Sequence, residues 1–192
     1  MNGLCAAKAA LSDLGEVVVV MHGTTNDDIC TIHRGTKVRK MHTSRRDAFQ
    51  TIGDEIAGTV TYPSLEVSLA SHAVKRGTNE LALMDKLEEK CAIVWYYPGM
   101  DPAILSAWKG YRGIVLVGTG LGHVGTHMVG SIREMSKAGT TFVMVSQCLH
   151  GRVCDRVYDT GRDLLSAGVI EGEDMLPEVA LVKLMWVLGN SS

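Results

Sequence analysis

The chain has 192 residues, of which 46% are hydrophobic and 21% charged, and its formal net charge is −2. This content is enough for a sizeable core in one domain or in two small ones. The nearly neutral charge argues against general nucleic-acid binding. No apolar run approaches the roughly 18 residues of a membrane span, and the first residues lack the pattern of a signal peptide. We therefore expect a soluble cytoplasmic protein that does not contact a membrane.

Five cysteines occur, which is an odd number, and none of them forms a C-x-x-C pair. This pattern indicates neither a disulfide framework nor a zinc ribbon. The histidines near the glycine loops lack metal-site spacing such as H-E-x-x-H. We expect buried thiols and no metal site. The cysteines are Cys5, Cys30, Cys91, Cys148 and Cys154.

The first half of the chain reads as a helix followed by short strands. Helical spacing covers residues 4–14, a β-branched run at 17–21 predicts a strand covered on both faces, and 29–33 predicts another strand. Residues 50–74 have the composition of surface loops, with one short strand at 58–62. We place the connection between two domains in this region. The expected division is 1–75 for the first domain, 76–90 for a linker or helix and 91–192 for the second domain.

The second half alternates strands with helices. Asp101 is expected to cap a helix whose first residue is Pro102, and Gly139 to close a crossover helix. This alternation predicts an α/β protein with a largely parallel sheet. The expected helices cover residues 79–90, 126–137, 160–167 and 174–188, and the expected strands cover 91–96, 114–117 and 141–146.

The densest polar tract covers residues 21–49 and holds Lys40. A domain rarely concentrates so many donors, acceptors and small residues unless that surface handles a ligand or a partner. A lysine beside hydroxyls and an acid can help to deprotonate a hydroxyl nucleophile. The alternative is a surface lysine before a short helix capped by Thr43 or Ser44. The basic residues between 34 and 46 are either a solvated loop or a surface for RNA or an anionic substrate.

Gly120, Gly122 and Gly125 fit the pattern G-x-G-x-x-G between a predicted strand and a predicted helix. A dinucleotide site also needs an acidic residue about 20 positions further on, but the next strand runs into Ser146-Gln147-Cys148. The alternatives are a tight turn, or a ligand loop at the carboxyl edge of the parallel sheet. We favour the ligand loop as a secondary site. The ligand-facing or interface loop would comprise Gly118, Thr119, Gly120 and Gly122.

Six segments in one order carry a family resemblance: VVVMHGTTNDD, HRGTKVRKMHTSRRDAF, YYPGMDPAI, YRGIVLVGTGLGHV, SQCLHGRV and GEDMLPEVALVKLMWVLG. Together they resemble the family of D subunits of archaeal glutamyl-tRNA(Gln) amidotransferases, a branch of the L-asparaginases. The tract V-x-K-x-x-T-x-x-x-D-A-F is shared most recognisably with ordinary asparaginases. The resemblance implies an α/β fold: the later part of the large asparaginase domain, followed by a smaller flavodoxin-like C-terminal α/β domain with a parallel sheet.

The resemblance also implies a chemistry, in which an amide side chain of asparagine or glutamine is hydrolysed to ammonia through a threonine nucleophile and an acyl-enzyme. The family's lysine, which works with a Thr–Asp pair to activate the nucleophile, falls on Lys40. A partner, the amidotransferase E subunit, would use ATP and Mg²⁺ to convert Glu-tRNA(Gln) to Gln-tRNA(Gln) with this ammonia, whereas this chain would hold no cofactor. A homodimer is implied, in which the loop from Gly118 to Gly122 faces a ligand.

Two family segments, T-G-G-T-I and H-G-T-D-T, do not occur in this sequence. Thr24 is not counted as the catalytic threonine, because it precedes Lys40 by too few residues. We expect a chain that begins inside the asparaginase module, exposes a sheet edge and is catalytically incomplete by itself. Three functions remain, in this order: part of an amidohydrolase, a non-catalytic dimerisation or scaffold module, and a nucleotide-binding domain.

Overall fold

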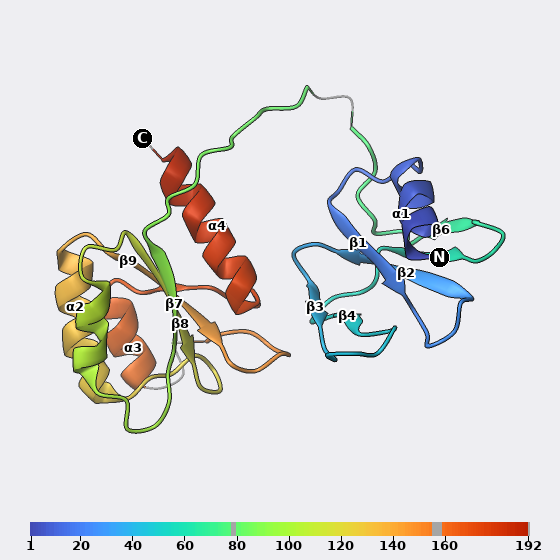
Figure 1. Ribbon diagram of the computed structural model, residues 1–192. Coiled ribbons are helices and arrows are strands. Elements are labelled where there is room, and N and C mark those ends of the chain that lie inside the picture. Colours follow the sequence, from blue (N-terminus) through green and yellow to red (C-terminus); the bar gives the residue numbers. More distant parts are fainter. Residues whose placement is uncertain (78–79, 155–158, 192) are drawn as a thin grey trace. The chain divides into compact units, whose positions relative to one another are not determined.

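The computed structural model describes residues 1–77, 80–154 and 159–191. The chain divides into two compact units, Met1–Leu81 and Ala82–Ser192 (Figure 1). Each unit has its own cluster of buried apolar side chains. Within the described ranges, no helix is long and apolar enough to cross a membrane.

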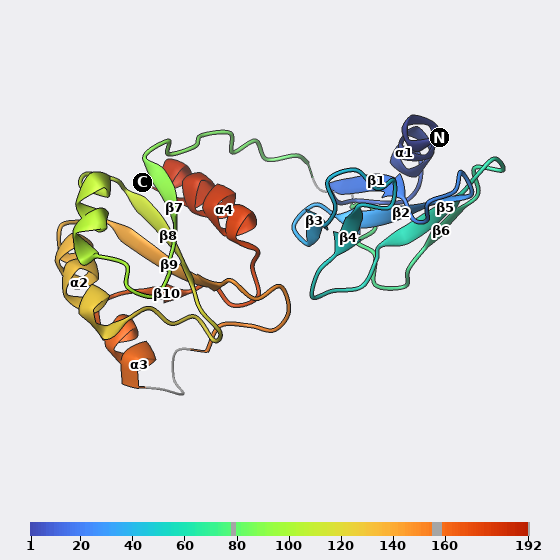
Figure 2. The same cartoon turned by 60° about the horizontal axis from the view of Figure 1, so that its bottom comes forward.

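The first unit packs one helix, α1 (Asn2–Ala10), against a four-stranded sheet in the order β1-β2-β5-β6, in which every neighbouring pair is antiparallel. A separate two-stranded hairpin is formed by β3 (Val38–Lys40) and β4 (Phe49–Thr51) (Figure 2). The strands of the larger sheet are β1 (Val18–His22), β2 (Ile29–Arg34), β5 (Gly58–Thr61) and β6 (Val67–Leu69).

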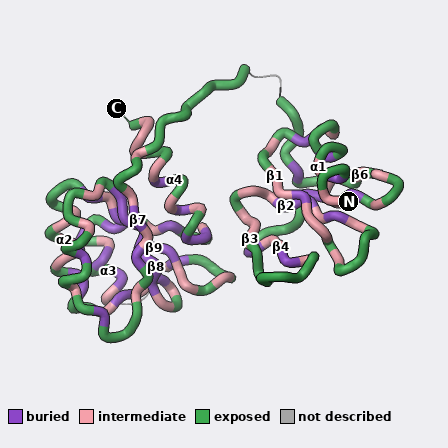
Figure 3. The backbone as a smooth tube through the Cα atoms, viewed as in Figure 1, coloured by how far each residue is buried: buried purple, intermediate pink, exposed green. Residues whose placement is uncertain are grey.

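Side-chain alternation on β2 explains how this unit packs. Cys30 and Ile32 are fully buried and belong to the core cluster that contains Cys5 and Ala9 of α1. Figure 3 marks the buried stretches of the backbone in purple. Because successive strand residues point to opposite faces, His33 points to the other face of the sheet. The apolar core of this unit therefore lies on the α1 side of β2.

The first unit departs from the sequence predictions in four ways. Its sheet is antiparallel, because short loops such as 23–28 cannot form the crossover of about a dozen residues that parallel strands need. Strand β1 lies at a sheet edge with only its central residue, Val20, buried, so the prediction of two covered faces was wrong. The helix begins and ends earlier than 4–14. Strands β3, β4 and β6 were missed, since three residues are too few for a periodic signal.

The second unit is a parallel sheet covered on both faces, in the order β10-β9-β8-β7. The 3₁₀ helix η1 and helices α2 and α3 cover one face, and α4 covers the other. The strands are β7 (Cys91–Trp95), β8 (Gly113–Gly118), β9 (Thr141–Ser146) and β10 (Ile170–Glu171). The helices are η1 (Pro102–Trp108), η2 (Thr126–Met128), α2 (Val129–Lys137), α3 (Asp159–Ser166) and α4 (Pro177–Asn190).

The predicted elements of this unit are largely confirmed. Every residue of β8 is buried, which agrees with its continuous apolar run. The Asp101 side chain accepts a hydrogen bond from the Ala103 amide and caps η1, with Pro102 in the first helical position. Gly139 follows α2 with a φ of +101°, a conformation that favours glycine.

Three helix predictions needed correction. The crossover helix begins as the 3₁₀ turn η2 and becomes α-helical only at Val129. Helix α4 begins at Pro177 rather than at residue 174, because proline is favoured in the first turn. No helix forms within residues 80–90, and residue 79 lies outside the described ranges. Leu81 and Leu83 in this segment are 93% and 77% exposed, so no apolar face is available to stabilise a short helix.

Candidate functional site

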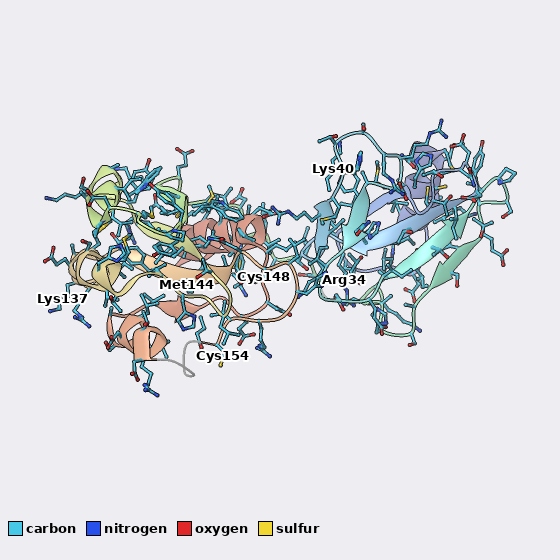
Figure 4. The ribbon with its side chains drawn as sticks, turned by 90° about the horizontal axis from the view of Figure 1, so that it is seen from below. Arg34, Lys40, Lys137, Met144, Cys148 and Cys154 are labelled. Atoms are coloured by element: carbon cyan, nitrogen blue, oxygen red, sulfur yellow. The ribbon has the colours of Figure 1, made fainter. Side chains whose placement is uncertain are left out.

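Lys40 is the last residue of β3, where it pairs with Phe49 of β4. Its Nζ atom lies 6.0 Å from the centre of the Phe49 ring, at the outer limit of a cation–π contact. Lys40 is labelled in Figure 4. Its side chain is exposed and makes no ion pair within the described part of the chain. The ammonium group is therefore accessible to a ligand. A shallow hollow there is lined by Lys40, Met41, His42 and Thr43.

The loop after Lys40 is a compact turn and contains no helix, so neither Thr43 nor Ser44 caps one. The imidazole Nδ1 of His42 accepts hydrogen bonds from the amides of Ser44 and Arg45, both at 3.1 Å. The Arg45 guanidinium donates two hydrogen bonds to the Asp47 carboxylate, at 2.8 and 2.6 Å. This pairing holds the pKa of Asp47 below its ordinary value. The acid that follows Lys40 in the sequence is thus paired with arginine.

Asp27 joins the loop after β1 to the loop after β3. Its Oδ1 atom lies 2.9 Å from His22 Nε2 and accepts a hydrogen bond of 3.1 Å from Arg46 Nη1. The hydrogen bond with His22 and the charge of Arg46 lower the pKa of Asp27. The carboxylate is therefore ionised at neutral pH and draws the two loops together beside the hairpin that carries Lys40.

Thr24 takes part in a local turn. Its hydroxyl donates a hydrogen bond of 2.5 Å to Asp28 Oδ1 and accepts one of 3.1 Å from the Asn26 amide. The bond from Thr24 lowers the pKa of Asp28. These contacts give the Thr24 hydroxyl a structural role in the turn. The exclusion of Thr24 from the catalytic residues stays a prediction.

His33 is a site residue that sequence reasoning missed. It lies on β2, its residue is 3% exposed, and its Nδ1 atom lies 2.8 Å from the Thr51 hydroxyl on β4. Its Nε2 atom is buried and has no hydrogen-bond partner within the described residues. Burial lowers the pKa of His33. The only sequence signal was a histidine on the strand face opposite to Cys30 and Ile32. The hollow beside it is lined by Gly23, Thr31, His33, Asp47, Phe49, Gln50, Thr51, Asp54 and Ile56.

The glycine-rich segment of the second unit forms a small hairpin at the carboxyl end of β8. The backbones of Thr119 and His123 exchange two hydrogen bonds, each 2.9 Å long. Gly120 and Gly122, between them, have φ angles of +54° and +104°, which favour glycine. Ser146 at the end of β9 donates a hydrogen bond of 2.5 Å to the Gly120 carbonyl. The loop is therefore held at the edge where ligands of open parallel sheets bind.

This geometry differs from a dinucleotide-binding turn, in which the glycines run directly into an α-helix. Gly125 instead precedes the 3₁₀ turn η2, and the α-helix begins only at Val129. Gln147 directly follows β9, and its side-chain amide donates hydrogen bonds to the carbonyls of Tyr96 and Val117. The structure places Lys40 in the first unit and the glycine loop in the second. No group of three or more His, Cys, Asp or Glu side chains in the described ranges is arranged to hold a metal ion.

Residues 90–192 match the glutaminase/asparaginase C-terminal domain, and residues 1–73 match the asparaginase N-terminal domain. The chain belongs to the asparaginase family. Its α/β architecture confirms the predicted asparaginase-like fold. The first unit contains the residues that match the N-terminal asparaginase domain, and the second unit contains those that match the C-terminal domain.

One relative is the D subunit of glutamyl-tRNA(Gln) amidotransferase from Archaeoglobus fulgidus, which is 60% identical to this chain over 194 residues. The match covers 100% of this chain and 46% of that protein. The D subunit from Methanosarcina mazei is 58% identical, and the match covers 100% of this chain and 45% of that protein. The thermostable L-asparaginase of Thermococcus kodakarensis superposes with a TM-score of 0.86 at 30% identity, over 99% of this chain and 56% of that one. This asparaginase-family chain thus spans about half the length of the relatives it matches.

Proposed function

We propose that this chain is part of an asparaginase-type amidohydrolase subunit, which releases ammonia from the side-chain amide of asparagine or glutamine for conversion of Glu-tRNA(Gln) to Gln-tRNA(Gln). The observation that carries the proposal is the exposed Lys40 ammonium at the end of β3, within the tract V-x-K-x-x-T-x-x-x-D-A-F. The identity of 60% to an archaeal D subunit of this amidotransferase supports the link to tRNA.

In this proposal the Lys40 ammonium helps to activate a threonine hydroxyl by electrostatic positioning and proton relay. The threonine and the Thr–Asp pair come from segments that do not occur in this sequence. The chain by itself is therefore catalytically incomplete. The bridge between Asp27, His22 and Arg46 ties the loop between β3 and β4 to the loop after β1, beside Lys40.

The assembly that we propose is a cytoplasmic homodimer joined to the amidotransferase E subunit, which binds ATP, Mg²⁺ and tRNA(Gln). The loop from Gly118 to Gly122 contributes to a ligand site or to the interface between copies. Its small hairpin at the carboxyl edge of the parallel sheet supports this role.

The test is ammonia release from asparagine and from glutamine. It compares this chain with a form extended upstream to supply the threonine segments, each with Lys40, with Lys40→Ala and with Lys8→Ala as an exposed-lysine control. We expect activity only in the extended form, reduced by about 10²–10⁴-fold in Lys40→Ala and unchanged in Lys8→Ala. Since Lys40 makes no ion pair within the described residues, the thermal midpoint should not change. Activity of the extended form that does not depend on Lys40 would refute the assignment, and Lys40-dependent activity of the short chain would refute its incompleteness.

A second role, as a dimerisation or scaffold module, is supported by the exposed apolar residues of α4. Val182, Trp186 and Val187 on α4 are 58%, 40% and 39% exposed. Apolar side chains gathered on one helix are typical of an interaction surface. Sedimentation of Val182→Glu should show fewer dimers than Val17→Glu, which alters an exposed valine of the first unit. Equal sedimentation of both variants would argue against α4 as the dimer surface.

A further inference from the structure

The hairpin that carries Lys40 depends on its surroundings for its orientation. It consists of two three-residue strands, Val38–Lys40 and Phe49–Thr51, and forms a sheet of its own. An isolated two-stranded hairpin is marginally stable in water. Arg46 in the loop of the hairpin contacts Asp27 at 3.1 Å, but both side chains are exposed. The strands of the hairpin are joined to β2 by the chain connection at residues 35–37 and by a part-buried side-chain contact, in which His33 Nδ1 lies 2.8 Å from Thr51 Oγ1.

The pairing of the hairpin relates this contact to Lys40. Val38 pairs with Thr51, and Lys40 pairs with Phe49. Paired residues lie on the same face of a sheet, and so do residues two positions apart in one strand. The Thr51 and Lys40 side chains therefore share one face of the hairpin. A hydrogen bond that turns Thr51 toward β2 also fixes the direction in which Lys40 leaves the hairpin.

The environment of His33 supports a specific role for this bond. His33 is 3% exposed, and its Nε2 atom has no hydrogen-bond partner within the described residues. A buried polar atom without a partner lowers stability, so an apolar side chain would suit a purely space-filling position better. The contact of the Nδ1 atom with Thr51 explains why an imidazole, and not an apolar side chain, lies at this position.

We propose that His33 and Thr51 are positioning residues for Lys40, and that their hydrogen bond sets the orientation of the β3–β4 hairpin on β2. The inference rests on the proposed role of Lys40 in amide hydrolysis. His33 itself touches no reacting group in this proposal. It acts through Thr51 and the pairing of the hairpin.

The chain offers a direct probe, because it contains two phenylalanines. Phe49 lies in the hairpin opposite Lys40, whereas Phe142 is fully buried in the second unit. With 4-fluorophenylalanine incorporated in the full chain, the fluorine NMR signal of Phe49 reports the hairpin. The signal of Phe142 serves as the internal control.

Two pairs of variants remove or retain the hydrogen bond between His33 and Thr51 while changing the size of the side chain little. His33→Leu and Thr51→Val remove it, while His33→Asn and Thr51→Ser keep a polar atom near the same position. Thr59→Val is the matched control, since Thr59 is a partly exposed β5 threonine whose hydroxyl makes no hydrogen bond within the described residues. We expect the first two variants to shift the Phe49 signal and not the Phe142 signal. Hydrogen exchange at the Met41 amide, which bonds to the Ala48 carbonyl, should be about fivefold faster.

The pattern across variants decides the proposal. His33→Asn and Thr51→Ser should restore the Phe49 signal, and the double variant of His33→Leu with Thr51→Val should shift it no further than either single change. An unchanged Phe49 signal in both single variants overturns the proposal. So does a failure of both polar variants to restore it, because that result indicates simple loss of packing.

Activity separates this inference from the proposed function. In the extended form, His33→Leu should lower kcat with little change in KM, and His33→Asn should recover it. If Lys40→Ala has no effect on ammonia release, the proposed function fails. The Phe49 signal still tests whether the contact between His33 and Thr51 orients the hairpin. If Lys40→Ala abolishes ammonia release and His33→Leu leaves kcat unchanged, the positioning proposal alone fails.

Discussion

Replacing Gly122 by alanine tests how the glycine hairpin is held in the second unit. Gly122 has a φ of +104°, and an added Cβ would lie 2.7 Å from Val153 Cγ1 and 3.0 Å from Met144 Cγ. Gly139 is a matched control, since its φ is +101° and an added Cβ would meet no atom within 4 Å. Backbone strain of this kind costs about 1–3 kcal/mol. Overpacking costs about 1–3 kcal/mol more at Gly122 only.

We therefore expect Gly122→Ala to lower the free energy of unfolding by about 2–6 kcal/mol, and Gly139→Ala by about 1–3 kcal/mol. Urea unfolding followed by tryptophan fluorescence measures both, because all three tryptophans, Trp95, Trp108 and Trp186, lie in the second unit. Adding Val153→Ala should cost less stability in the Gly122→Ala background than in the wild-type chain, since it removes the close contact. Equal losses for the two glycine variants would refute the packing of the hairpin against Val153.

Two further predictions concern thiol reactivity and pH. Cys148 is exposed, so the prediction of a buried thiol was wrong for this residue, whereas Cys30 is buried and burial raises its pKa to about 12. Alkylation under native conditions should therefore label Cys148 first and Cys30 only after unfolding, as read by mass spectrometry. Equal rates would contradict the packing of α1 on β2. Because burial lowers the pKa of His33 below its ordinary value of 6.5, the unfolded chain binds the proton more readily, and the stability of the first unit should fall as the pH drops below about 6.5. Above that pH, His33 contributes no further change in stability. Unfolding followed by the Phe49 fluorine signal checks this, and the same slope in His33→Asn would contradict the assignment to His33.

The parallel sheet of the second unit could be predicted because its physical basis is local in the sequence. Strands β8 and β9 are buried on both faces, and a continuous apolar run records that burial directly. The first unit was harder to predict, because pairing direction depends on which strands meet. The segment 79–90 shows the opposite case, since its apolar spacing suits a helix but Leu81 and Leu83 find no surface to cover.

The candidate site was predictable only where residues are close in sequence. Lys40 was named through the tract from Val38 to Phe49, which is one uninterrupted piece of chain. The contact of His33 with Thr51 joins residues 18 positions apart on two different sheets, and it depends on the hairpin register that pairs Val38 with Thr51. A register shift by one residue would turn Thr51 away from His33, so neither composition nor spacing could have revealed the pair.

One face of β2 packs in the core of the first unit, and the other face contacts the hairpin that carries Lys40. Cys30 and Ile32 are fully buried in the core cluster that α1 shares, whereas His33 points the other way, to the hairpin that carries Lys40. Substitutions on the first face remove apolar packing and are expected to lower the stability of the whole unit. Changes at His33 or Thr51 remove one polar contact and leave that core in place. We therefore expect that substitutions at His33 or Thr51 reorient the lysine hairpin without unfolding the sheet on which it rests, so that the two effects can be measured separately.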